Sequence, residues 1–147
     1  MMWGKRSYMT SKAVRFTNPA ELAQPPGYSN VVEILRGRIV FIAGQIAVDR
    51  EGKIVGKGDF EAQAHQAFAN VGKALRSVGC TPRDLVKLTV YVRDMSQIGA
   101  YRKARDRFLG STTPPSAPAM TLVEVSQLFS DEFLIEVDAV AAAESPD

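Results

Sequence analysis

The sequence predicts an α+β protein in which two helices cover one face of a single β-sheet. Apolar residues recur at helical spacing from Phe60 to Val78, and a strictly alternating segment follows at residues 86–93. Two further alternating segments, near 119–126 and 133–142, close the chain. The predicted order of elements is ββ(β)αβαββ. A chain of 147 residues, 46% of them hydrophobic and 23% charged, is predicted to form one domain that buries a core without disulfides or metal.

The start of the chain is predicted to be a tail and a loop, residues 1–24. A single domain follows over residues 25–142, and residues 143–147 form a short C-terminal end. Turn-forming residues are frequent before Gly27, which favours loop structure there. Two strands are then predicted on either side of a turn at residues 36–38.

Capping and helix-breaking residues bound the remaining elements. The stretch 46–55, the bracketed strand in the predicted order, carries a turn. Asp59 is a good N-cap for the first helix, and Gly79 can end that helix in the left-handed conformation. A second helix is predicted to begin near Ser96 and to end before the proline-rich loop at residues 113–118.

Composition argues against several classes of partner. The net charge of +2 does not predict a nucleic-acid partner, and the basic residues near the start are interpreted as a solvated tail: Lys5, Arg6, Lys12 and Arg15. The chain has no run of about 18 apolar residues and no signal peptide, which predicts no membrane partner and a cytoplasmic location. The one cysteine, Cys80, is expected to pack as a small apolar group at a helix end.

The residues of common metal and cofactor sites are also missing from the sequence. The one histidine, His65, lies in the middle of a predicted helix, so a surface or groove histidine is the simpler interpretation than a zinc ligand or a member of a Ser-His-Asp triad. The glycines at residues 52–58 lack the spacing of a phosphate-binding loop, and no dinucleotide fingerprint is present. We therefore predict no metal and no cofactor.

Several segments form a combination that is typical of one known family. They are Phe-Ile-Ala-Gly-Gln-Ile at 41–46, the segments 58–79 and 84–95, and a closing pair of strands at 118–125 and 133–141. Together they resemble the RidA (YjgF/YER057c/UK114) family. The resemblance covers residues 25–142 and implies a chorismate-mutase-like, YjgF-type fold that forms a homotrimer with small-molecule clefts at the subunit interfaces. A sheet covered by helices on one side agrees with this, because its other face is often closed by assembly.

The resemblance also implies an activity and the residues that carry it. The best-known members are hydrolases of C=N bonds in reactive enamines and imines. Glu136 matches the glutamate that positions the attacking water, and Tyr28 matches a tyrosine at the pocket mouth. Gly44 matches the glycine whose backbone carbonyl faces the substrate nitrogen. Such a reaction mainly needs an oriented substrate, a positioned water and a path for protons.

Two positions depart from the pattern of the active members. Met120 stands where they keep an arginine that holds the substrate carboxylate, and Leu122 stands where they often carry a small or sulfur-bearing residue. Methionine has no donor for a carboxylate. Removing one partner of a buried charge pair costs about 2–5 kcal/mol, so we expect a ligand other than the usual 2-imino acid. Arg102 falls where active members commonly place an asparagine; it either restores a positive anchor or belongs to a solvated basic face.

The pattern alone leaves the position of Glu136 open. Alternation places Leu134, Glu136 and Asp138 on one face of a strand, which is either the solvent side of an edge strand or the wall of a cleft. Three functions compete accordingly: hydrolysis of an imine, enamine or related reactive metabolite; binding of a metabolite without turnover; and the endoribonuclease or translation-inhibitor role described for some relatives. The modest charge and the absence of a base-stacking motif do not support the third.

Overall fold

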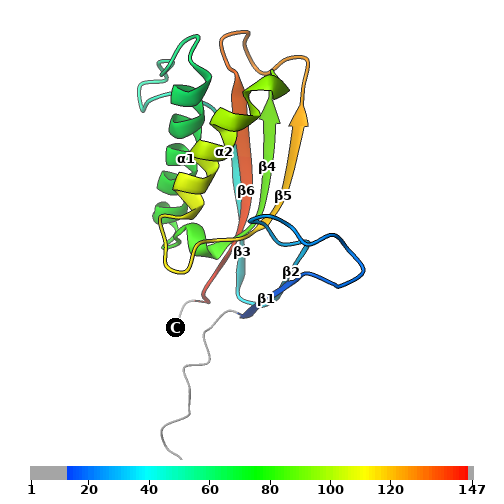
Figure 1. Ribbon diagram of the computed structural model, residues 1–147. Helices are drawn as coiled ribbons and strands as arrows, with labels where there is room; N and C mark the ends of the chain where they lie inside the picture. The colour runs from blue at the N-terminus through cyan, green and yellow to red at the C-terminus, as the bar shows by residue number, and fades with distance from the viewer. Residues whose placement is uncertain (1–12, 146–147) are drawn as a thin grey trace, which may run out of the picture.

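The computed structural model describes residues 13–145 (Figure 1). Its strands are β1 (Ala13–Thr17), β2 (Val31–Arg36), β3 (Arg38–Gln45), β4 (Leu85–Val92), β5 (Ala119–Glu124) and β6 (Ile135–Ala143). Its helices are α1 (Phe60–Ser77) and α2 (Ile98–Leu109), and short 3-10 turns lie at Pro82–Asp84 and Met95–Gln97. The basic residues Lys5, Arg6 and Lys12 lie outside the described residues.

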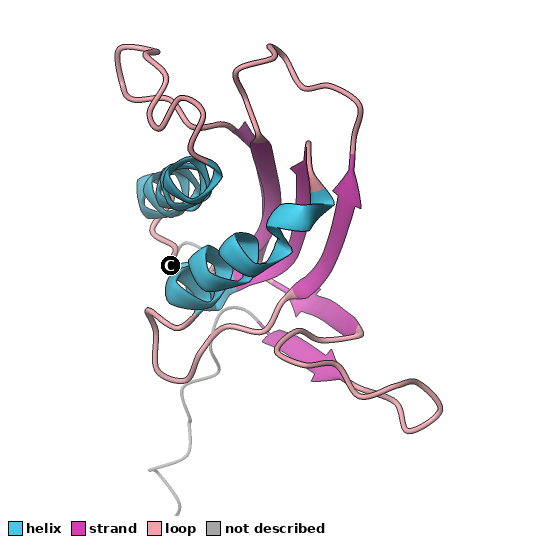
Figure 2. Ribbon diagram, turned by 45° about the horizontal axis from the view of Figure 1, so that its top comes forward, coloured by secondary structure: helices cyan, strands magenta, loops and turns pink. Residues whose placement is uncertain are grey.

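The main sheet has four strands in the order β3-β6-β4-β5. β4 and β5 run parallel, while β6 runs antiparallel to both of its neighbours, β3 and β4. Both helices lie on the same side of this sheet (Figure 2). The predicted α+β class with two helices on one face is therefore confirmed. β6 is an inner strand, which removes the interpretation of Glu136 as part of an edge strand.

Alternation along the strands places the core between the sheet and the helices. Every second residue of β4 and β6 is buried against α1 and α2, while the residues between them face away. Phe68 of α1 reaches across to α2, where its ring stacks on Phe108 with the ring centroids 5.2 Å apart. The core residues of the two central strands are Leu85, Leu88, Val90, Val92, Ile135, Val137, Ala139, Ala141 and Ala143.

The helix boundaries agree with the predicted caps. The side chain of Asp59 accepts a hydrogen bond from the backbone N–H of Ala62 at 3.1 Å, which satisfies one of the free donors at the start of α1. Gly79 adopts a φ of 76°, and the N–H of Cys80 donates to the carbonyl of Leu75 at 2.9 Å, as in a Schellman motif. Cys80 is buried in the core, as expected for a small apolar group.

The first two strands, β1 and β2, do not belong to the single sheet that the sequence predicted. β1 lies in the segment expected to be a tail and loop, and it pairs with β2 in a separate two-stranded sheet. The guanidinium of Arg15 donates to both carboxylate oxygens of Glu33 across this pair, at 2.6 and 2.9 Å. Gly37 adopts a φ of 109°, and this turn directs β3 away from β2 into the main sheet. The stretch 46–55 contains only one isolated bridge, between Val48 and Ile54, and not a third strand.

One buried polar side chain joins α1 to two loops. Gln63 is fully buried, and its amide nitrogen donates to the carbonyls of Gly56 and Glu132 at 3.2 and 2.8 Å. Its amide oxygen accepts from the N–H of Leu134 at 2.9 Å. The helix is thereby tied to the segment that leads into β6. A side chain of similar size without polar atoms would remove the partners of the Glu132 carbonyl and the Leu134 N–H, whereas the Gly56 carbonyl would still accept from the N–H of Asp59 at 2.9 Å.

Replacing Gln63 with leucine should therefore lower the free energy of unfolding by about 3 kcal/mol, because each buried unsatisfied group costs roughly 1–3 kcal/mol. The matched control is Gln97→Leu, the same change at an exposed residue without a side-chain hydrogen bond at the start of α2. We expect the control to stay within about 0.5 kcal/mol of the wild type in urea unfolding. Equal effects of the two changes would contradict this role of Gln63.

Candidate functional site

A bulge in β3 brings Gly44 and Glu136 together. The pairing of β3 with β6 shifts between Ile42, opposite Ala139, and Gln45, opposite Val137, so two residues of β3 lie against one of β6. A methyl group added to Gly44 would overlap the carboxylate of Glu136, lying only 2.7 Å from its carboxyl carbon. The carboxylate therefore rests directly on the backbone of Gly44, which only a residue without a side chain permits. These are the two residues that the resemblance matched to a water-positioning glutamate and a substrate-facing glycine.

The carboxylate of Glu136 has polar neighbours on the side of the sheet away from the helices. Tyr91 lies directly across from Glu136 on β4, and its hydroxyl donates to Asp138 in a long hydrogen bond of 3.4 Å. The negative charge of Asp138, followed by burial and the charge of Glu136, raises the pKa of Tyr91 above its ordinary value. Tyr91 therefore keeps its proton at neutral pH and remains a hydrogen-bond donor beside two acids.

Tyr91 is a residue of this site that the sequence reasoning missed. The alternation of β4 showed that Tyr91 faces away from the core, but it did not show which side chains of other strands share that face. The signal becomes visible only with the register, which places Tyr91 opposite Glu136 and Thr89 opposite Asp138.

Met120 and Leu122 lie on the opposite face of the sheet from Glu136. They pair with Leu88 and Val90 of β4, whose side chains belong to the core, and both are partly buried against that core. Because directly paired residues of neighbouring strands point to the same face, Met120 and Leu122 point toward the helix-covered side. β5 is an edge strand, so its outer side carries no strand within residues 13–145. One protomer alone does not bring Met120 and Glu136 into one pocket.

Tyr28 lies near the beginning of β5. Its neighbour Ser29 is buried, and the Ser29 hydroxyl donates to the carbonyl of Ala117 at 2.6 Å. The Ser29 N–H donates to the carbonyl of Pro118 at 3.1 Å. These two hydrogen bonds hold the loop of Tyr28 close to the residues that precede Met120. The half-buried Tyr28 and Met120 therefore belong to the same end of the edge strand.

Two helix residues singled out in the sequence also have defined places. Arg102 follows the buried Tyr101 and is exposed on α2, on the helix-covered side of the sheet and thus away from Glu136. His65 lies in a groove between α1 and α2, as the interpretation of a groove histidine predicted.

Within residues 13–145, no group of three or more histidine, cysteine or acidic side chains is placed to hold a metal ion. No helix in the same part of the chain is long and apolar enough to cross a membrane.

Comparison with known proteins identifies the family. The family model described as Endoribonuclease L-PSP matches residues 19–143. The chain belongs to the RidA family. A RutC family protein of Pyrococcus abyssi is 34% identical over 134 residues, which make up 91% of this chain and 99% of that relative. A protein of Salmonella typhimurium named 2-iminobutanoate/2-iminopropanoate deaminase is 33% identical over 105 residues, 71% of this chain and 80% of the relative.

A solved structure supports the same assignment. The crystal structure of a Rid family protein from Yersinia pestis superposes on this chain with a TM-score of 0.77 at 33% sequence identity. The superposition covers 88% of this chain and 98% of the other. The two helices and the mixed sheet are therefore those of the RidA family.

The contact between Gly44 and Glu136 gives a direct test of the site's geometry. Gly44→Ala should displace the carboxylate and lower the free energy of unfolding by about 1–3 kcal/mol, the usual cost of overpacking. Combining it with Glu136→Ala, which removes the overlapping group, should recover part of that loss.

The matched control is Gly99→Ala in the first turn of α2, where an added methyl group meets nothing within 4 Å. Because alanine favours helix over glycine, the control should be neutral or stabilising by up to about 1 kcal/mol. Chemical denaturation of the four variants measures these differences. Strictly additive effects of Gly44→Ala and Glu136→Ala would show that the two residues do not touch.

Proposed function

We propose that this RidA family member hydrolyses a C=N bond of a small reactive imine or enamine, in clefts between the subunits of a homotrimer. The observation that carries the proposal is the carboxylate of Glu136 resting on the backbone of Gly44, on the side of the sheet away from the helices. The family supports it further, since the relative from Salmonella typhimurium is named as a 2-iminobutanoate/2-iminopropanoate deaminase.

Hydrolysis of an imine requires only a few groups of the protein. Glu136 holds a water molecule and accepts a proton from it as the oxygen attacks the imine carbon. The carbonyl of Gly44 accepts the N–H of the substrate and fixes the orientation of its C=N bond. Glu136 returns that proton to the nitrogen, which gives a carbinolamine, and the hydroxyl proton of the carbinolamine then passes through Glu136 to the leaving nitrogen as the C–N bond breaks. The products are a carbonyl compound and ammonia or an amine, and an enamine enters the same sequence after protonation on carbon to its imine form. Tyr91 keeps its proton, donates a hydrogen bond to Asp138 and so places a neutral hydroxyl beside Glu136.

Assembly is proposed because the sheet exposes apolar side chains on the face that carries Glu136. Phe41 and Ile39 on β3 are 79% and 55% exposed, and they pair with Val140 and Ala142 of β6 on the same face. Exposed apolar surface of this kind is typical of subunit interfaces. In such an interface, the edge strand β5 of one subunit would lie beside this face of the next subunit. Tyr28 and Met120 of the first subunit would then lie close to Gly44 and Glu136 of the second.

The substrate class follows from Met120. The thioether of Met120 offers no hydrogen-bond donor, so a carboxylate gains nothing at this position. Apolar contact with Met120 and Leu122 favours an imine or enamine with an uncharged body over a 2-imino acid. Arg102 provides the alternative anchor if a carboxylate is bound after all, since it lies on the same side of the sheet as Met120.

Turnover of freshly generated imines should depend on Glu136. Glu136→Gln removes the base and should lower the rate of ammonia release by about 100-fold or more. The matched control is Glu144→Gln, which removes the same charge from an exposed residue beyond the end of β6 and should leave the rate unchanged. Wild-type turnover that survives Glu136→Gln would overturn the proposed role, while a wild type that binds imine analogues without turnover would favour the metabolite-binding alternative.

The same assay can test which residue, if any, binds a substrate carboxylate. Met120→Arg should raise the turnover of 2-imino acids relative to uncharged imines by about tenfold or more, because it adds a charged partner for the carboxylate. If the wild type already prefers 2-imino acids, and Arg102→Ala removes that preference, Arg102 is the anchor and the proposed substrate class is wrong.

Assembly should depend on the exposed face of the sheet. Phe41→Asp places a charge among the apolar side chains of that face and should convert the trimer to monomers in sedimentation experiments. Phe129→Asp is the matched control, because Phe129 is 90% exposed but lies in the loop between β5 and β6. A trimer that survives Phe41→Asp and dissociates with Phe129→Asp would place the interface elsewhere.

A further inference from the structure

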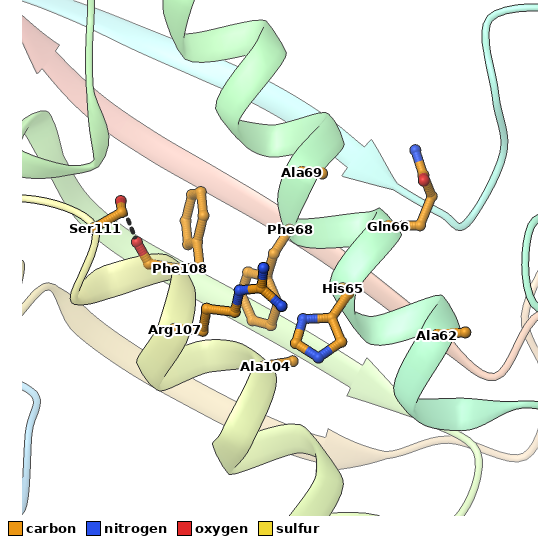
Figure 3. A pocket seen from close by; sticks show the side chains of 9 residues that line it. All are labelled: Ala62, His65, Gln66, Phe68, Ala69, Ala104, Arg107, Phe108 and Ser111. Carbon is orange, nitrogen blue, oxygen red and sulfur yellow. Dashed lines mark hydrogen bonds between the residues drawn. The ribbon is translucent and has the colours of Figure 1, made fainter.

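A groove runs between α1 and α2 on the outer surface of the helices, away from the proposed active site (Figure 3). It has a volume of about 390 Å³, which is within the usual range for small-molecule sites. Gly44 and Glu136 lie on the other side of the sheet, so the groove stays accessible if that side is covered by assembly. None of the roles discussed so far uses its residues.

The floor of the groove is apolar. Phe108 is half-buried and stacks on the fully buried Phe68, so one ring presents a rigid surface to the groove. Small residues on both helices, Ala62, Ala69 and Ala104, leave the space above this ring open. A flat apolar group can therefore lie on Phe108 without displacing larger side chains.

The rim of the groove is positively charged or able to donate hydrogen bonds. Arg107 of α2 and His65 of α1 reach into the groove from its two walls, as Figure 3 shows. Within residues 13–145, Arg107 forms no ion pair with a carboxylate. Glu61 stands beyond the lining, where Lys103 holds it at 2.8 Å and its nearer oxygen is 3.7 Å from Nε2 of His65.

A second hollow continues the groove toward the end of α1. It has a volume of about 360 Å³ and shares Ala69, Phe108 and Ser111 with the first. Its rim carries Lys73 and Arg76. The two hollows together are lined by three cationic side chains, those of Lys73, Arg76 and Arg107, and by His65, with no aspartate or glutamate. The charge of the lining is therefore complementary to an anion.

We infer that the groove between α1 and α2 binds a small amphipathic organic anion, whose apolar body lies on Phe108 and whose carboxylate or phosphate meets Arg107 and His65. An ion pair between the anion and the Arg107 guanidinium, which pairs with no carboxylate of residues 13–145, brings a charge-assisted hydrogen bond. The apolar body gains contact with Phe108 and the neighbouring alanines. The inference concerns a second site and is independent of the proposed hydrolysis.

Binding can be measured with naphthoate, an aromatic carboxylate, and with naphthylmethanol as its neutral counterpart. The assay follows the backbone amide signals of the intact protein by NMR during titration. Naphthoate should shift the signals of Ala69, Ala104 and Phe108, and naphthylmethanol should bind about tenfold more weakly because it lacks the charge.

Two variants and two controls make the test specific. Arg107→Gln should weaken naphthoate binding about tenfold, and Ala69→Glu, which adds a carboxylate at an exposed helical position in the groove, should weaken it at least as much. Lys53→Gln, the same loss of charge on an exposed loop, should bind naphthoate as the wild type does. Glu136→Gln should also bind it normally, which separates this groove from the proposed active site.

Three results would overturn the inference. They are equal affinity for naphthoate and naphthylmethanol, unchanged naphthoate affinity in Arg107→Gln, and signal shifts that gather on β3 and β6 with binding lost in Glu136→Gln. The last of these would place the anion on the open face of the sheet rather than between the helices.

Discussion

The packing of two helices against only one face of the four-stranded sheet is the constraint on which the rest of this structure depends. The alternating residues of β4 and β6 divide between a buried apolar side and a side that carries Thr89, Tyr91, Glu136 and Asp138. Because the helices bury only the first side, the polar groups and the apolar side chains of β3 remain together on the second. The same one-sided packing gives the protein a buried core on one face of the sheet and leaves apolar side chains exposed on the other. It explains how a chain of this size combines a tight core with an exposed Phe41.

This division also decides how the candidate site is arranged. Gly44 and Glu136 meet within one chain because the bulge in β3 brings its backbone under the carboxylate. The loop of Tyr28 lies at the start of the edge strand, where Met120 also lies, because Ser29 is bonded to the residues before β5. The sheet separates Met120 from Glu136. An active site that uses both must be built across a subunit boundary, so assembly and catalysis are one proposal rather than two.

Local signals predicted most of the fold, while long-range register decided the rest. Asp59 and Gly79 bound α1 as expected because capping depends on a few neighbouring residues. β1 was missed because five residues carry little signal of their own and are held by pairing with β2 and by Arg15 on Glu33. Tyr91 was missed for the same reason, since its proximity to Glu136 follows from strand register. The resemblance to the RidA family supplied Glu136 and Gly44 together, but it could not show that Met120 lies on the other face.

The position of Met120 explains why an apolar side chain suits the fold there, where the resemblance to the family leads to the expectation of an arginine. Its side chain is partly buried against Leu88 and the core, so an unbranched apolar side chain adds to the packing beneath α2. An arginine at the same position has to lay its aliphatic stem along this apolar surface and carry its charge out past the edge of β5. Such an arrangement is maintained when a carboxylate ligand compensates for ordering the charged group. In the absence of such a ligand, methionine is the more stable choice, because one part of its side chain adds to the core packing while the rest stays available for the apolar contact proposed above.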